Sequence, residues 1–264
     1  MKHIGLFEGI GGFSLAAEWM GWETIAWCEW IEYNKKILRK HFPKANEHGD
    51  ITQTDFTIYK GKCDIVTGGF PCQPYSTAGQ RKGKEDERHL WPEMLRAIRE
   101  IQPRWVIGEN VHGIINWGRG LVVKEIETDL ENEGYKLFPP AVLPACAIGA
   151  DHKRDRTWFV AYSMQRGLQT PFTGFGAELG VPKEAPNNFG GLNAEQLVLT
   201  KRNRGDLRNG DGIPNWMDRI GALGNAIVPQ VAYQLFRVIA LMEVEMLNCQ
   251  PGNEVQCGVG KNNI

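Results

Sequence analysis

Short apolar runs alternate with longer amphipathic stretches along most of the chain. The short runs predict strands, and the stretches with apolar residues three or four positions apart predict helices. The predicted strands span 3–7, 24–27, 64–67, 105–108, 135–146 with a break at two prolines, and 157–162. The predicted helices span 13–20, 31–41, 90–100, 121–134 and 230–247. Strands and helices in alternation predict an α/β fold, with a mostly parallel sheet and helices on both faces.

The helical periodicity also predicts which side chains face the core. The predicted core positions are Met94, Leu95, Ile98 and Ile101 in one helix, Val122, Ile126 and Leu130 in the next, and Val231, Leu235, Val238, Ile239, Met242 and Met246 in the last.

The regular pattern fades between residues 163 and 212, where glycine and asparagine become frequent. We therefore expect a main α/β domain made of 1–162 and 213–248, a small domain at 163–212, and a disordered tail at 249–264; the motifs below, which lie in the main domain, make it the candidate catalytic and cofactor-binding domain. A locally basic run at 201–208 is suited to phosphate contacts, or it belongs to a solvated insertion.

Composition narrows the class of protein. With 264 residues and 42% hydrophobic residues, the chain predicts a soluble protein, without a membrane span or an apolar leader. The six cysteines are scattered, which indicates a reducing, cytoplasmic compartment and no metal site. A formal net charge of −1 argues against coating nucleic acid indiscriminately, so any nucleic-acid surface must be a local cleft.

A glycine-rich turn follows the first predicted strand, and a predicted helix follows the turn. It reads Phe7-Glu8-Gly9-Ile10-Gly11-Gly12, and Glu29 comes about 20 residues later. A turn of this kind lets a nucleotide approach the backbone, and the later acid can bind ribose hydroxyls. An NAD site would also fit, although the spacing is not Gly-x-Gly-x-x-Gly. Trp30 could stack on an adenine ring, or it is a core aromatic that opens the next helix.

A cysteine stands directly after the predicted strand 64–67, in Gly69-Phe70-Pro71-Cys72-Gln73-Pro74. The two prolines fix the backbone on either side of the thiol, at the edge of the sheet where ligands bind. This arrangement suits a nucleophile. For an arbitrary cysteine, a buried structural role is the alternative.

Glu109 ends the next predicted strand, so it should face the same edge as Cys72. It is a candidate acid if burial raises its pKa, or a strand-end glutamate paired with an arginine. Arg154 and Arg156 precede the strand at 157–162 and share one face if the chain is extended there. They suit a carbonyl or carboxylate in the cleft. The alternatives are a surface basic cluster, or an arginine used only on DNA phosphates.

Seven motifs appear in one order along the chain: Phe-x-Gly-x-Gly, Glu-Trp, Gly-Asp-Ile, Pro-Cys-Gln, Glu-Asn-Val, Arg-x-Arg and Gly-Asn-x-x-x-Pro. Together they resemble the DNA cytosine-5 methyltransferases. The resemblance implies a Rossmann-like, S-adenosylmethionine-dependent methyltransferase fold and methylation of cytosine carbon 5 through a covalent bond to Cys72. It implies that Glu109 serves the ring nitrogen, that Arg156 holds the base carbonyl O2, and that Arg154 supports them. His152 stands where the family commonly has glutamine, so its role is open.

The resemblance also implies the cofactor contacts. Phe7, Gly9 and Gly11 would surround the methionine end, with Glu29 on the ribose and Trp30 and Asp50 at the adenine. The implied cofactor-binding set is Phe7, Gly9, Ile10, Gly11, Gly12, Glu29, Trp30, Asp50, Ile51, Pro71, Leu90 and Asn225. The alternatives are a solvated turn aspartate for Asp50 and a helix-capping asparagine for Asn225.

The implied substrate is double-stranded DNA, with the target cytosine flipped out of the helix and with 163–212 as a target recognition domain. The resemblance implies a monomer in the cytoplasm of a bacterial or phage-infected cell, in the setting of restriction and modification. An RNA cytosine-5 methyltransferase of the same fold, a non-catalytic DNA-binding relative and an NAD-dependent oxidoreductase are the alternatives.

Overall fold

The computed structural model describes residues 1–71, 90–148, 154–165 and 225–248. Its strands are β1 (Lys2–Leu6), β2 (Glu23–Cys28), β3 (Asn46–His48), β4 (Ile65–Gly68), β5 (Trp105–Val111), β6 (Tyr135–Leu137), β7 (Ala141–Pro144) and β8 (Asp155–Ser163). Its α-helices are α1 (Gly12–Trp19), α2 (Glu32–His41), α3 (Trp91–Ile101), α4 (Leu121–Asn132) and α7 (Pro229–Asn248). Short 3₁₀ turns include η1 (Ile51–Gln53) and η7 (Ala145–Ile148).

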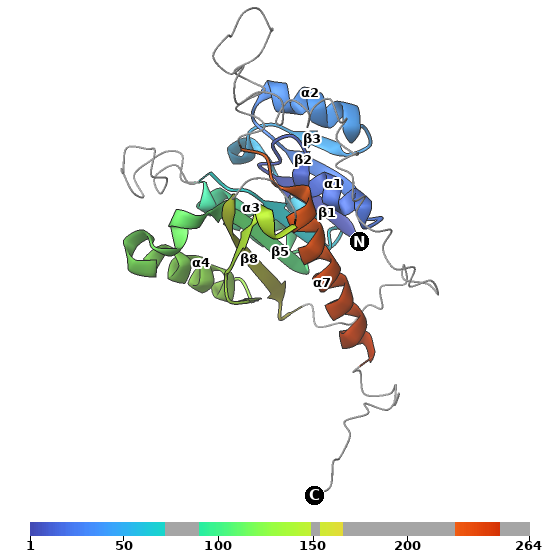
Figure 1. Ribbon diagram of the computed structural model, residues 1–264. Coiled ribbons are helices and arrows are strands. Elements are labelled where there is room, and N and C mark those ends of the chain that lie inside the picture. Colours follow the sequence, from blue (N-terminus) through green and yellow to red (C-terminus); the bar gives the residue numbers. More distant parts are fainter. Residues whose placement is uncertain (72–89, 149–153, 166–224, 249–264) are drawn as a thin grey trace, which may run out of the picture.

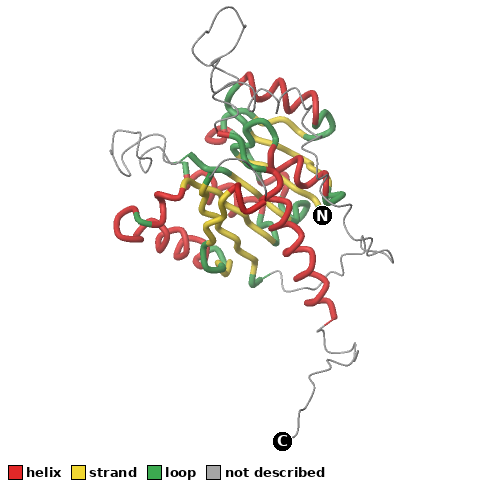
Figure 2. Tube along the Cα trace, viewed as in Figure 1, coloured by secondary structure: helices red, strands yellow, loops and turns green. Residues whose placement is uncertain are grey.

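The described strands form one eight-stranded sheet in the order β3-β2-β1-β4-β5-β8-β6, with β7 also paired to β8. β3, β2, β1, β4 and β5 pair in parallel. β8 is antiparallel to β5, β6 and β7, so it alone runs against the others. The mostly parallel α/β sheet expected from the sequence is confirmed, and Figures 1 and 2 show it between helices.

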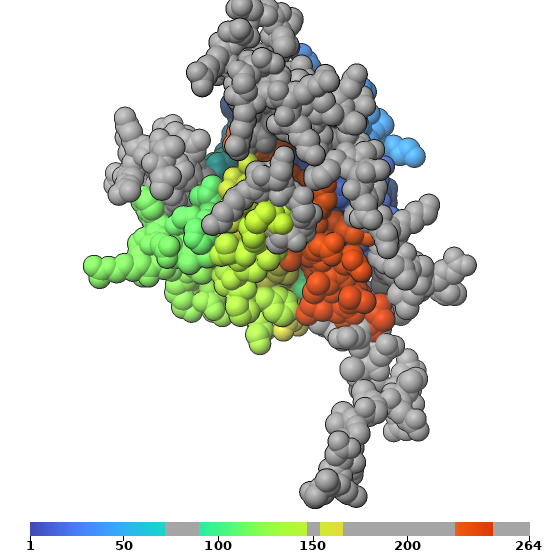
Figure 3. All heavy atoms as spheres, viewed as in Figure 1, coloured from blue at the N-terminus to red at the C-terminus, as the bar shows by residue number. Residues whose placement is uncertain are grey.

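Alternate side chains of each central strand enter different cores on the two faces of the sheet, as a pleated strand requires. Ile65 packs with α1 and α7, whereas its neighbour Val66 packs with α3 and α4. Because both faces are covered by helices, the central strands are apolar on both sides, which is typical of parallel sheets. In Figure 3 the red-orange surface of α7 adjoins the yellow-green surface that includes η7, which α7 contacts.

β5 and β8 are longer than the apolar pattern predicts, and polar residues extend them. β5 continues through Glu109 to Val111, and β8 begins at Asp155, so that Arg156 lies within it. The parallel pairing of β4 with β5 ends at Gly68 and Gly108, and beyond that level β8 is the strand, among the described residues, that pairs with β5. Polar residues extend these strands because their side chains meet at the site rather than in an apolar core.

The predicted core positions of α3 and α4 hold: Leu95 is partly buried and the other six are buried. The stripe predicted for α7 is wrong at Val238, which is 53% exposed. The buried face instead contains Ala232, Tyr233, Phe236 and Glu243 besides Val231 and Ile239. The helix is apolar on more than one side, so periodicity alone did not select the face that packs on the sheet. The side chain of Met246 lies outside the described residues.

Several expectations concern segments outside the described residues: the small domain expected at 163–212 apart from 163–165, of which Ser163 ends β8, the basic run at 201–208, the tail at 249–264, and His152. Within the described part, no helix is both long enough and apolar enough to cross a membrane. The same residues contain no cluster of three histidine, cysteine or acidic side chains placed to hold a metal ion.

Candidate active site

Glu109 is the central acidic group of the site. Its side chain is on the face of β5 that α1 and α7 cover, together with Trp158, its partner in β8. A Cβ atom built on Gly69 would lie 3.4 Å from Glu109 Oε2. The carboxyl group therefore lies against the segment that leads from β4 to Cys72. Cys72 itself is outside the described residues, and Pro71, half-buried, is the last described residue before it.

Burial controls the charge of Glu109, which is only 8% exposed. Loss of hydration raises its pKa to about 7, against the opposing pull of the Arg156 and Arg154 charges. A carboxyl group with this pKa holds a proton near neutral pH and can donate it, which is the property that the predicted role requires.

Arg156 forms an ion pair with Glu109, with 2.9 Å between Arg156 Nε and Glu109 Oε1. The contact follows from the antiparallel register: Arg156 pairs with Val111 and Trp158 with Glu109, so Arg156 and Glu109 are diagonal neighbours on one face. Arg154 approaches from the same end of β8, and its Nη2 donates to the carbonyl oxygen of Ala226 at 2.8 Å. Arg156 thus orients the acid in this structure, and its contact with a base carbonyl stays a prediction.

The residue after Glu109 holds the chain just before Cys72. Asn110 is 2% exposed, and its Nδ2 donates to the carbonyl oxygen of Phe70 at 3.0 Å. Sequence reasoning used Asn110 only as part of a motif and gave it no role. The sequence did contain a signal for this role: Asn110 follows the candidate acid Glu109. An amide buried at that position must form hydrogen bonds with a neighbouring segment.

Residues 225–229, which are distant in the sequence, pack against the candidate site. A Cβ atom on Gly12 would lie 2.7 Å from the Ile227 carbonyl oxygen, and one on Gly69 would lie 3.3 Å from Ile227 Cδ1. Ile227 therefore contacts both the glycine-rich turn and the segment before Cys72. Asn225 is exposed, and Val228 directly precedes the first residue of α7, so Asn225 does not cap that helix.

The glycine-rich turn joins β1 to α1 through a left-handed backbone. Phe7, Gly9 and Gly11 have φ values of 52°, 60° and 94°. Glu29 Oε2 accepts a hydrogen bond from Gly9 N at 2.7 Å, and Glu29 Oε1 accepts one from Ile31 N at 2.7 Å. Glu29 thus fixes the turn to the end of β2, and the structure brings together the two motifs that were predicted to form one pocket.

The predicted adenine end lies beside that acid. Trp30 is 72% exposed, so the alternative of a core aromatic is wrong. Asp50 precedes η1, and its Oδ1 accepts hydrogen bonds from Thr52 N at 2.9 Å and Thr52 Oγ1 at 2.8 Å. No described residue donates to its Oδ2, which leaves that oxygen able to accept from a ligand.

The remaining predicted cofactor residues are at the same edge of the sheet. Ile10 is half-buried in the turn and Ile51 is buried in η1. Leu90 is half-buried at the N-terminal boundary of α3.

Glu8 is a buried acid that sequence reasoning missed. It is 2% exposed, and its Oε1 accepts from Ser14 N at 2.8 Å, in the first turn of α1. Glu8 thus caps α1, because Gly11, the N-cap residue of that helix, has no side chain that could accept this hydrogen bond. A Cβ atom on Gly5 would lie 1.9 Å from Glu8 Oε2, so the acid needs a glycine in β1. Burial raises the pKa of Glu8 to about 7, and the charge of Glu29 adds to this effect. The signal for this contact in the sequence was Gly5, because a glycine inside a strand often marks a place where another group approaches the backbone closely.

The Glu8→Gln variant is expected to be more stable than the wild type at pH 8 by about 2 to 3 kcal/mol, and equally stable near pH 4.5. A carboxyl group whose folded pKa is raised is favoured while protonated, so its cost to stability appears as pH rises from 4.5 towards about 7. Urea unfolding at the two pH values measures the difference. Glu18→Gln, at an exposed position on α1, is the control and should show no such gain. A Glu8→Gln protein less stable than the wild type at pH 8 would contradict the assignment.

Comparison with known proteins identifies the family. A family model described as C-5 cytosine-specific DNA methylase matches residues 1–196, so the chain belongs to this family. The resemblance read from the motifs is confirmed. Similar relatives include the type II methyltransferase M.Eco47II of Escherichia coli, 40% identical over 158 residues that cover 59% of this chain and 38% of that protein. The type II methyltransferase M.HhaI of Haemophilus parahaemolyticus is 33% identical over 170 residues, covering 64% of this chain and 51% of the relative.

The chain matches about half or less of the length of these relatives. Among solved structures, the Entamoeba histolytica methyltransferase EhMeth shares the fold with a TM-score of 0.51 and 24% identity, over 66% of this chain and 54% of that chain.

Proposed function

We propose that this chain methylates carbon 5 of a cytosine flipped out of duplex DNA, with S-adenosylmethionine as the methyl donor. The observation that carries the proposal is the position of Glu109. A buried carboxyl group with a pKa of about 7, held by Arg156, lies against the segment that leads to Cys72. A thiol and a proton donor at neighbouring strand ends are the two groups that addition to a cytosine ring requires.

The described residues fit the proposed cofactor. The left-handed turn at Phe7, Gly9 and Gly11 leaves room for close approach, Glu29 is a buried acceptor beside it, and Asp50 Oδ2 is open to a donor. Trp30 offers an exposed aromatic face. When bound, S-adenosylmethionine supplies an electrophilic methyl group.

The chain's own residues would prepare the base to accept that group. The Cys72 thiolate forms a bond to carbon 6 of the cytosine, and the ring electrons that this displaces make carbon 5 nucleophilic. Glu109 donates its proton, or a hydrogen bond, to ring nitrogen 3 as negative charge builds there. After carbon 5 is methylated, water takes the proton from carbon 5, the Cys72 sulfur leaves carbon 6 as a thiolate, and nitrogen 3 returns its proton to Glu109, which restores the aromatic ring. Arg156 and Arg154 keep the acid in place, and Arg156 is the proposed donor to O2.

Two further requirements follow from this chemistry. A free cysteine has a pKa of about 8.5, so cations near the base must stabilise the thiolate. Flipping the base costs a few kcal/mol, which contacts in the cleft must recover. We propose that 163–212 supplies target recognition and that, as in its type II relatives, the methylation serves modification of a specific DNA sequence.

Incubation of the full chain with S-adenosylmethionine labelled in its methyl group tests the proposal. We expect label in duplex DNA, at carbon 5 of cytosine, and none in structured RNA of matched length. Bisulfite sequencing of DNA from cells that express the chain would then map the target. Label in RNA alone would favour the RNA methyltransferase alternative, and label in neither polymer would contradict the proposal.

A further inference from the structure

Residues 50–56 carry the proposed adenine contacts at the edge of the described sheet. The segment follows β3, the last strand in the sheet order on that side. η1 is three residues long, and local hydrogen bonds join Gln53 N and Thr54 Oγ1 to the Asp50 carbonyl oxygen and Thr54 N to the Ile51 carbonyl oxygen. Two of its carbonyl groups, those of Ile51 and Thr54, also accept hydrogen bonds from a side chain on α3, which joins the segment to that helix.

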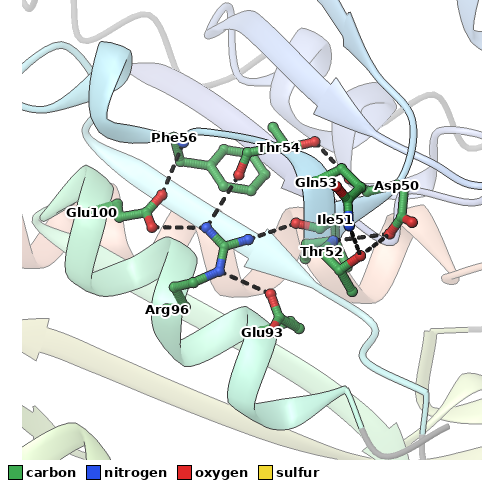
Figure 4. A network of polar contacts seen from close by, with 9 residues as sticks. All are labelled: Asp50, Ile51, Thr52, Gln53, Thr54, Phe56, Glu93, Arg96 and Glu100. Atoms are coloured by element: carbon green, nitrogen blue, oxygen red, sulfur yellow. Dashed lines mark hydrogen bonds and ion pairs between the residues drawn. The ribbon is translucent and has the colours of Figure 1, made fainter. Parts of the chain in front are cut away.

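That side chain is Arg96, shown at the centre of Figure 4. Its Nη2 donates to the Ile51 carbonyl oxygen at 2.5 Å, and its Nη1 donates to the Thr54 carbonyl oxygen at 3.1 Å. The guanidinium carbon lies 5.8 Å from the centre of the Phe56 ring. One planar group thus contacts the segment at three points.

Two acids of the same helix hold the guanidinium in this position. Arg96 Nε donates to Glu93 Oε2 at 2.8 Å, and Arg96 Nη1 donates to Glu100 Oε1 at 2.7 Å. Glu100 Oε2 also accepts from Phe56 N at 2.9 Å, so this acid contacts both the arginine and the segment. The fork geometry of arginine makes the bridge possible, because a lysine ammonium is a compact charge without a planar set of donors.

We propose that Arg96 is a positioning residue for recognition of the adenine base. It holds the Ile51 and Thr54 carbonyl groups against α3 and so fixes where Asp50 presents its carboxylate. This inference rests on the proposed cofactor and assigns a role to a residue that no sequence motif singled out. Arg96 does not touch the base and acts through Asp50 and Ile51.

The chemistry of the base makes this role measurable. Adenine carries an amino group at position 6, which can donate to a carboxylate, whereas hypoxanthine carries a carbonyl oxygen there, which a carboxylate repels. A correctly placed Asp50 should therefore favour the adenine form by about tenfold or more, as expected for a hydrogen bond to a charged group. Without Arg96, Glu93 and Glu100 would face the carbonyl oxygens of the segment without a cation between them, and the carboxylate of Asp50 would lose its fixed position.

The test compares the affinities of the full chain for S-adenosylhomocysteine and S-inosylhomocysteine by calorimetry, which needs no turnover. The wild type should prefer the adenine ligand by about tenfold or more. In Arg96→Gln we expect this ratio to fall to about twofold or less, mainly through weaker binding of the adenine ligand. Arg96→Lys, which keeps a cation between the two acids, should lose most of the preference too, because it cannot bridge both carbonyl groups.

Arg99→Gln is the matched control. Arg99 is three residues further along α3, where its more exposed side chain pairs with Glu133. The control should keep the wild-type ratio. Thermal unfolding shows whether each variant folds, and Arg96→Lys decides the question if Arg96→Gln does not fold.

Equal weakening of both ligands in the Arg96 variants, or an unchanged ratio in Arg96→Lys, would overturn the role of Arg96. A wild type that binds neither ligand would instead contradict the proposed cofactor. The two failures are therefore distinguishable.

Discussion

Replacing Cys72 with alanine is expected to lower methyl transfer to DNA by about 10⁴-fold or more, because the thiolate forms the bond that makes carbon 5 of the cytosine reactive. Affinity for S-adenosylhomocysteine should stay within about twofold of the wild type, since binding needs no thiolate. DNA that contains 5-fluorocytosine cannot lose its substituent from carbon 5 after methylation. We therefore expect the wild type to stay covalently attached to such DNA and the variant not to attach, as read by denaturing electrophoresis.

Cys146→Ala is the control for this experiment. Cys146 is an exposed free cysteine in η7, so it tests whether any accessible thiol could form the adduct. Cys28 and Cys63 are buried and much less accessible to DNA. A Cys72→Ala protein that still forms the covalent complex would end the assignment of the nucleophile.

Replacing Glu109 with glutamine is expected to lower the single-turnover rate of methylation by about 10² to 10⁴-fold, the range for loss of a positioned proton donor. Glutamine keeps the size of the side chain but cannot supply the proton. The group acts in its protonated form, and burial raises its pKa to about 7. The wild-type rate should therefore fall as pH rises above about 7, where Glu109 loses its proton. The rate of Glu109→Gln should not show this fall.

Single-turnover rates between pH 6 and 9, at saturating DNA and cofactor, measure both effects. Glu127→Gln is the control, because Glu127 pairs with Lys124 on the solvent side of α4. It should leave the rate and its pH dependence unchanged. A Glu109→Gln rate within about fivefold of the wild type, or a fall in rate above about pH 7 that persists in this variant, would exclude Glu109 as the donor.

Most of the secondary structure followed from the sequence because strand and helix periodicities are local properties. The expected strands and helices are present among the described residues, with shifts at their ends. The errors have a common origin. At Val238 and at the ends of β5 and β8, the outcome depended on which neighbour the element met in space.

Parts of the candidate site were also predictable. Glycines with a left-handed backbone, an acid after β2 and a glutamate at the end of a buried strand are signals in the residues themselves. The partner of Glu109 was left open between a base and an arginine. Only the antiparallel register of β5 and β8 places Arg156 next to that acid.

By itself, the sequence determined the class of fold and the family, and it predicted the candidate reactive groups, because apolar periodicity and short motifs are properties of neighbouring residues. The tertiary structure decided how those groups are held. Glu8 beneath the turn, Ile227 against Gly12 and Gly69, and Arg96 against the segment 50–56 are contacts between residues distant in the chain or between elements that only packing brings together. Local sequence patterns do not predict such contacts, because the burial, the pKa and the hydrogen-bond partners of a side chain are fixed only when the sheet and its helices assemble.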